Sequence, residues 1–172
     1  TLVAANASGV AGAAEVAGFE VGPDGYLYVA RSTATTGVIE KYSAAAGLSL
    51  GVVASAATGF RPSEVNNIRF AADGSMFVLT APVPGAVRTN IAQIDPATGT
   101  LLRTLPLSAG AVPVHFTIGA GNVLYYSSGS PAAPAVRRFD LATGEELAPF
   151  AALGLTAGGY VIPLATQDAA TT

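Results

Sequence analysis

One short pattern occurs three times in this chain and constrains its fold more than any other feature. Each copy is an apolar stretch, a tight turn of small or acidic residues, and a second apolar stretch. The turns are centred on Asp24, Asp73 and Gly121, which lie 49 and 48 residues apart. Asp-Gly between two β-prone stretches predicts a hairpin, because glycine accepts the positive φ that such turns need. The sequence therefore predicts a repeat built from hairpins.

A second turn completes each repeat. Gly47, Gly99 and Gly144 each close a turn between two further apolar stretches, as in Asp95-Pro96-Ala97-Thr98-Gly99. Aspartate can bond its own backbone and proline fixes φ, so this turn has a local physical cause. Each repeat thus contains four short strands. We expect repeats at 15–63, 64–111 and 112–155, with a last strand of a preceding repeat at 1–14 and a trailing strand and disordered tail at 156–172.

Four-strand units that recur at this period predict an all-β protein made of β-propeller blades. Continuous apolar runs such as Met76–Leu79 fit strands that are covered on both faces. Propellers close with about 4–8 blades, so three antiparallel blades plus terminal strands form an incomplete wheel. Three solutions are open: a fragment of a longer chain, two copies that complete a ring, or an open filament.

The composition excludes several classes of function. Charged residues make up 11% of the chain and apolar residues 51%. Such a weakly charged surface fits either coverage by partners or a harmless bias toward alanine. No uninterrupted apolar stretch is long enough for a membrane-spanning helix. The net charge of −3 and the lack of a basic patch argue against nucleic acid as a partner, and the lack of cysteine excludes disulfides and thiolate chemistry.

Four segments carry a family resemblance. They are GPDGYLYVA (22–30), FAADGSMFV (70–78), QIDPATGTLLRTL (93–105) and RFDLATGEEL (138–147). These segments resemble the repeats of NHL-type and gluconolactonase-like β-propellers, above all those of secreted bacterial propeller proteins. The resemblance covers about residues 15–155. It implies a wheel of six or seven blades, each with four antiparallel strands.

The same resemblance suggests where a ligand would bind. Gluconolactonase-like enzymes hold a divalent cation at the channel mouth with Glu, Asn and Asp. Here the polar residues near the starts of first strands are Glu15, Glu64, Asn66, Asn67 and His115. They do not reproduce the full triad, and the third repeat has Val112 where the first two have Glu15 and Glu64. We therefore name these five as candidate ligand-binding residues and assign no metal, cofactor or catalytic residue.

Simple structural roles account for the other polar residues. We expect His115 to be a hydrogen-bonded structural histidine beside Phe116. The turn aspartates, Asp24, Asp73, Asp95 and Asp140, are expected to bond local backbone. Glu145 and Glu146 are expected to form an exposed turn pair. The aromatic residues of the second strands, Tyr26, Tyr28, Phe77, Tyr125 and Tyr126, are expected in the core.

These features favour a non-enzymatic, extracellular or cell-surface propeller module that acts through self-assembly or by binding a partner. The partner would be further copies of the chain, another protein or a carbohydrate. The alternatives are part of a metal-dependent lactonase-like hydrolase, and a carbohydrate- or protein-binding wheel that uses loops 32–37, 81–90 and 129–135. Asn6-Ala7-Ser8 matches a glycosylation sequon.

Overall fold

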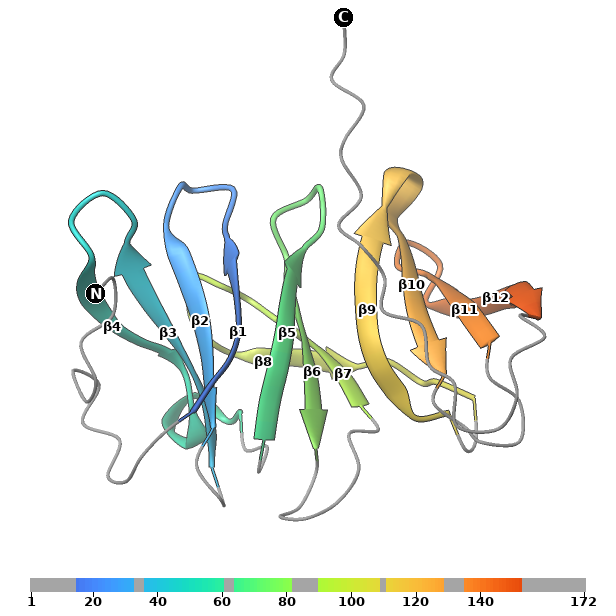
Figure 1. The fold of residues 1–172 in the computed structure, drawn as a ribbon, viewed down its shortest axis with the longest axis horizontal. Helices are drawn as coiled ribbons and strands as arrows, with labels where there is room; N and C mark the ends of the chain where they lie inside the picture. The colour runs from blue at the N-terminus through green and yellow to red at the C-terminus, as the bar shows by residue number, and fades with distance from the viewer. Residues whose placement is uncertain are drawn as a thin grey trace, which may run out of the picture. The chain divides into compact units, whose positions relative to one another are not determined.

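A computed structural model of the chain describes residues 15–32, 36–60, 64–81, 90–108, 111–128 and 135–152. These residues form three four-stranded antiparallel sheets and no α-helix, as Figure 1 shows. In every sheet each strand pairs with the next one along the chain. The prediction of an all-β fold with three four-stranded antiparallel blades is confirmed.

The strands fall into three sets of four. The first sheet contains β1 (Glu15–Val21), β2 (Leu27–Ser32), β3 (Gly37–Ser43) and β4 (Leu48–Ala54). The second sheet contains β5 (Glu64–Phe70), β6 (Met76–Ala81), β7 (Asn90–Ile94) and β8 (Leu101–Thr104). The third sheet contains β9 (Pro113–Gly119), β10 (Val123–Ser128), β11 (Ala135–Asp140) and β12 (Glu145–Ala152). Contacts divide the chain into two units, Thr1–Thr104 with the first two sheets and Leu105–Thr172 with the third.

The aspartates close their turns as the sequence predicts. Each accepts a hydrogen bond from the backbone N–H two residues later. The pairs are Tyr26 to Asp24 at 3.2 Å, Ser75 to Asp73 at 2.9 Å, Ala97 to Asp95 at 2.9 Å and Ala142 to Asp140 at 2.8 Å. Hydrogen bonds from the Ser75 hydroxyl and amide lower the pKa of Asp73. The prediction of local backbone bonding is confirmed for all four.

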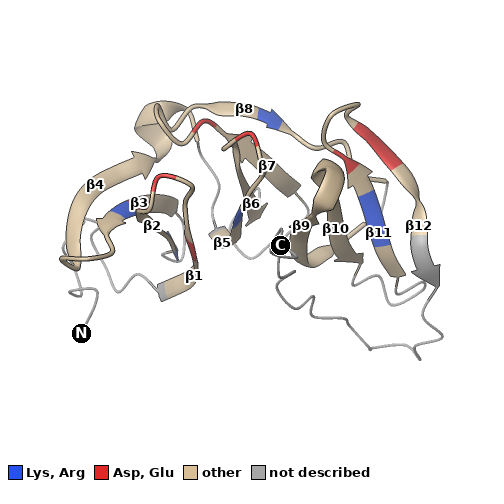
Figure 2. Cartoon of the chain, turned by 90° about the horizontal axis from the view of Figure 1, so that it is seen from above, with Lys and Arg blue, Asp and Glu red and all other residues tan. Residues whose placement is uncertain are grey.

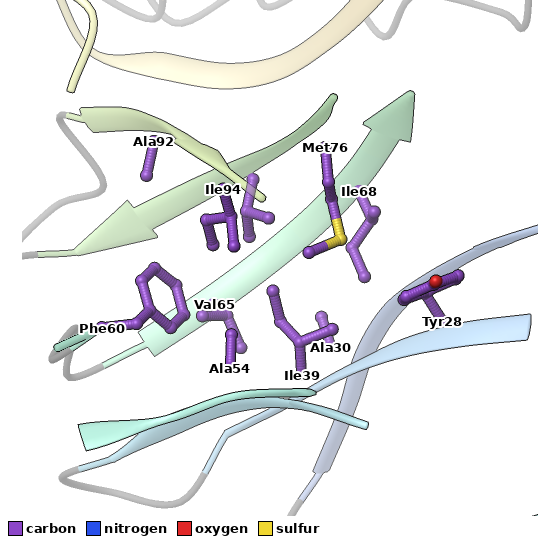
Figure 3. Packing of buried hydrophobic residues seen from close by; sticks show 11 residues of the cluster. Tyr28, Ala30, Ile39, Ala54, Phe60, Val65, Ile68, Met76, Ala92 and Ile94 are labelled. Atoms are coloured by element: carbon purple, nitrogen blue, oxygen red, sulfur yellow. The ribbon is translucent and has the colours of Figure 1, made fainter. Parts of the chain in front are cut away.

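The core of the first unit lies between its two sheets. Figure 3 shows side chains of both sheets meeting there. The first sheet supplies Tyr28, Ala30, Ile39 and Ala54, and the second supplies Val65, Ile68, Met76, Val78, Ala92 and Ile94, with Phe60 from the connection between them. Every residue of β6 is buried, so the continuous apolar run that marks this strand reflects coverage on both faces.

Two details refine the expectations. The strand β8 ends at Thr104, two residues before Pro106, which has no N–H to offer a ladder. Tyr26 lies in the turn and is 38% exposed, whereas Tyr28 is 2% exposed. The side chain of Lys41 lies 4.2 Å from the centre of the Tyr26 ring, so this tyrosine covers a cation and is not in the core.

Several predictions concern residues outside the described part of the chain. They are the lead-in strand at 1–14, the trailing strand and tail at 156–172, the sequon at Asn6, and most of the loops at 32–37, 81–90 and 129–135.

Candidate interaction surface

The first strand of the first sheet, β1, exposes a row of apolar side chains, and β4 of the same sheet also exposes Leu48, Leu50 and Val52. Val16, Phe19 and Val21 are 53%, 64% and 56% exposed. Phe19 pairs with Val29 and Val21 pairs with Leu27 on β2, so both point to the face opposite Gly18 and Glu20. We call these three side chains the β1 row. Large apolar side chains that gather in water usually mark a contact with another molecule or domain.

The second sheet carries the same row at the same positions. Counting 49 residues onward, the β1 row becomes Val65, Ile68 and Phe70 on β5. The strand pairings agree, because Ile68 faces Val78 as Phe19 faces Val29. Val65 is 1% exposed, Ile68 is fully buried and Phe70 is partly buried. The row on β5 is thus a core element, while the row on β1 meets solvent.

The β5 row is buried because it packs on the inner strands of the first sheet. Tyr28, Ala30 and Ile39 form the face that receives it, and we call this the receiving face. Tyr28 and Phe70 meet edge to face, with ring centres 5.0 Å apart. The contact shown in Figure 3 therefore joins an apolar row of one sheet to the receiving face of the sheet before it.

Two close approaches fix the register of this contact. A Cβ built on Gly18 would lie 2.8 Å from the backbone nitrogen of Asn67, so only glycine fits against β5 there. At the other side of the sheets, a Cβ on Gly99 would lie 1.7 Å from the carbonyl oxygen of Val53 on β4. Between them, Arg69 of β5 bonds the carboxylate of Glu20 at 2.9 Å.

The predicted channel-mouth residues occupy equivalent places at the starts of first strands. Glu15 begins β1 and Glu64 begins β5, and both side chains lie outside the described part of the structure. Asn66 and Asn67 form a bulge where two residues of β5 face one of β6, and Asn67 has a φ of 37°. His115 lies at the matching irregularity of β9.

The structure brings only part of this set together. Asn66 and Asn67 lie against Gly18 of the first sheet. The backbone N–H of His115 donates to the Ser127 hydroxyl at 3.2 Å, and its carbonyl accepts from that hydroxyl at 3.3 Å. Within the described ranges, no three His, Asp or Glu side chains converge on a point where a metal ion would sit. The five residues therefore remain a prediction.

Sequence reasoning missed a buried ion pair in the first sheet. Arg31 of β2 and Glu40 of β3 meet at 3.0 Å, with side chains 4% and 0% exposed. The Ser49 hydroxyl of β4 donates to the other carboxylate oxygen at 2.5 Å. One signal was available, because Glu40 interrupts an apolar stretch at a position that faces inward on a strand. The second sheet has Thr80 and Ala92 at these positions.

A second acidic centre lies in the third sheet and corrects the expectation of an exposed turn pair. Glu145 is exposed, but Glu146 is partly buried on β12. Its carboxylate accepts hydrogen bonds from the amide and hydroxyl of Ser108 and from the hydroxyl of Tyr126, and Arg137 lies 3.5 Å away. Figure 2 shows the basic residues of β11 beside the acidic start of β12. The strand β12 begins at Glu145, so both glutamates lie in the strand and not in the turn.

Burial and hydrogen bonding act in opposite directions on these groups. Burial alone would raise the pKa of Glu146, but the hydrogen bonds from Ser108 and Tyr126 and the charge of Arg137 outweigh it and lower that pKa below the ordinary value of 4.5. Burial and the Glu146 carboxylate raise the pKa of Tyr126. Tyr126 is therefore a neutral donor that holds the glutamate ionised. These bonds join β12 to β10, β11 and the segment that carries Ser108, so we call the cluster the Glu146 latch.

Comparison with solved structures identifies the architecture. The chain is similar to a calcium-binding protein, regucalcin, from Agrobacterium tumefaciens, with 19% identity and a TM-score of 0.52 over 76% of this chain and 43% of that one. It is also similar to virginiamycin B lyase from Staphylococcus aureus, with 18% identity and a TM-score of 0.50 over 77% of this chain and 39% of that one. A third neighbour is the Dos1 propeller, with 12% identity and a TM-score of 0.51 over 84% and 36%.

The fold is that of a β-propeller. Each four-stranded sheet is one blade. At these identities the likeness shows the fold alone, and the chain spans less than half the length of these neighbours. No family model matches the sequence, and no curated protein matches it. Among the described residues, none form a helix long and apolar enough to cross a bilayer.

Proposed function

We propose that this chain is a non-catalytic β-propeller module that acts by assembly, and that the β1 row is its binding surface. One observation carries the proposal: the same three apolar positions are exposed on β1, whereas on β5 two are buried and the third, Phe70, is partly buried against the core. The strand β5 of the second repeat packs on a neighbouring blade. Because β1 carries apolar residues at the same positions, it can pack on a blade in the same way. The partner that fits the β1 row is therefore another propeller blade.

Two further features support assembly over catalysis. The two partly or fully buried carboxylates are bonded within the blades: Glu40 is held by Arg31 and Ser49, and Glu146 by Ser108, Tyr126 and Arg137. Groups bonded in this way stabilise blades and do not face a substrate. The turns resemble those of secreted bacterial propellers, which supports an extracellular or cell-surface site of action.

The test replaces one member of the β1 row and measures what the protein binds. Phe19→Asp places a charge in the row, whereas Leu50→Asp places one at a similarly exposed apolar position on β4. We expect Phe19→Asp to abolish association in light scattering, and Leu50→Asp to leave it intact. Equal behaviour of the two variants would overturn the proposal. So would stoichiometric binding of a divalent metal that is lost in Glu64→Ala, because that result would favour the lactonase-like alternative.

A further inference from the structure

The third sheet has residues of similar type at the positions that form the receiving face of the first sheet. Counting 97 residues onward from the first sheet, Tyr28, Ala30, Ile39 and Lys41 become Tyr125, Ser127, Val136 and Arg138. The pairings match, because Tyr125 faces Arg138 as Tyr28 faces Lys41. The chemistry matches as well: tyrosine is kept, a small residue replaces a small one, a branched residue a branched one, and a cation a cation.

The two receiving faces differ in how much of them is covered. Tyr28, Ala30 and Ile39 are buried because the β5 row lies on them. On the third sheet Tyr125 and Val136 are only partly buried, whereas Ser127 is buried. Arg138 is partly buried, as Lys41 is on the first sheet. One chain thus contains both halves of the contact that joins its first two sheets: an exposed row on β1, and a partly exposed receiving face on the third sheet.

We propose that these two halves meet between copies, so that the β1 row of one copy packs on the third-sheet receiving face of a second copy. This inference rests on the proposed function and names its partner. The contact is head to tail, because two different surfaces take part. Such a contact either closes between two copies, which gives six blades, or continues from copy to copy.

The charges at the proposed contact are compatible with it. Within the chain, Glu20 of the receiving sheet pairs with Arg69 of the sheet that packs on it. In the proposed contact Thr117 takes the place of Glu20, and Glu20 takes the place of Arg69. A hydroxyl meets a carboxylate there, so the exchange brings no like charges together. Glu20 keeps its own partner, Arg69, at the same time.

Complementation between two variants tests the inference. Phe19→Asp disables the row, and Tyr125→Asp disables the third-sheet receiving face; Val136→Asp serves in its place if Tyr125→Asp does not fold by circular dichroism. We expect each variant alone to remain monomeric in light scattering at concentrations where the unchanged chain forms dimers or longer species. An equimolar mixture should form dimers, because each partner still supplies the half that the other has lost.

The outcomes separate this inference from the proposed function. An unchanged chain that stays monomeric at every concentration would overturn both. Association that Phe19→Asp abolishes and Tyr125→Asp and Val136→Asp leave intact would keep the β1 row as a binding surface and overturn the head-to-tail partner, since two β1 rows would then meet each other. A mixture of the two variants that stays monomeric would also overturn the inference.

Discussion

The strands β1 and β5 carry apolar residues at the same positions, but those of β1 are exposed to solvent and those of β5 are covered by the first sheet. Val16, Phe19 and Val21 of β1 are more than half exposed, and their counterparts on β5 are in the core. The difference does not lie in the strands, since both pair with their neighbours in the same register. It lies in whether another sheet covers them. Apolar alternation therefore specifies a face that can be buried, and the neighbouring sheet decides whether it is.

The polar positions of the two sheets extend this comparison and give the largest expected effect. Glu40→Ala leaves the buried Arg31 guanidinium without its carboxylate, which should cost about 3–5 kcal/mol of stability in urea denaturation. The double change Arg31→Thr with Glu40→Ala installs the residues of the second sheet. It should recover most of the loss, because exchanging a whole buried pair is often close to neutral. A double variant as unstable as the single one would show that the two sheets are not equivalent here.

The close packing of the second sheet on the first at Gly99 gives the next largest expected loss of stability. Gly99→Ala meets both a strained φ of 70° and the Val53 carbonyl. Strain of roughly 1–2 kcal/mol and overpacking of roughly 1–3 kcal/mol together predict a loss of about 3.5 kcal/mol. Gly25→Ala is the matched control, since its φ is 78° and a Cβ there meets nothing within 4 Å. It should lose only the strain, and equal losses in urea denaturation would contradict the close approach.

The direct comparison of the two rows predicts a smaller difference. Ile68→Ala removes a fully buried side chain between the sheets and should cost about 3 kcal/mol. Phe19→Ala removes the matching exposed side chain and should change stability by no more than about 0.5 kcal/mol when measured at a concentration where the chain is monomeric. A large loss for Phe19→Ala under those conditions would mean that the β1 row is already part of a core.

Much of the fold was predictable, because it depends on local signals. Turn chemistry at Asp24, Asp73 and Asp95 acts within a few residues, and these signals placed the strands and their period correctly. The contact between sheets was not predictable at the level of residues. The fit of Gly18 against Asn67 depends on two segments that meet only in the folded chain.

The polar groups show the same limit. The Glu145-Glu146 pair reads as an exposed turn, and only the strand register reveals that Glu146 turns inward toward Tyr126. Glu40 in an apolar stretch signals a buried charge, but its partner Arg31 comes from another strand. The sequence can indicate that a single position holds a buried charge, but it does not show which residue of another strand is its partner.

The latch at Glu146 gives the smallest effect and a pH signature. Its pKa is lowered in the folded state, so its contribution to stability is complete above the unfolded value of about 4.5 and is lost as the pH falls through the lower folded value. Hydrogen bonds to an ionised group are worth about 1.5–3 kcal/mol, which sets the expected loss at about 2 kcal/mol. The free energy of unfolding, measured by urea denaturation at pH 7 and at decreasing pH, should show this loss. Glu146→Gln should remove this part of the pH dependence. An unchanged profile in that variant would assign the dependence to the turn aspartates, whose lowered pKa values act in the same direction.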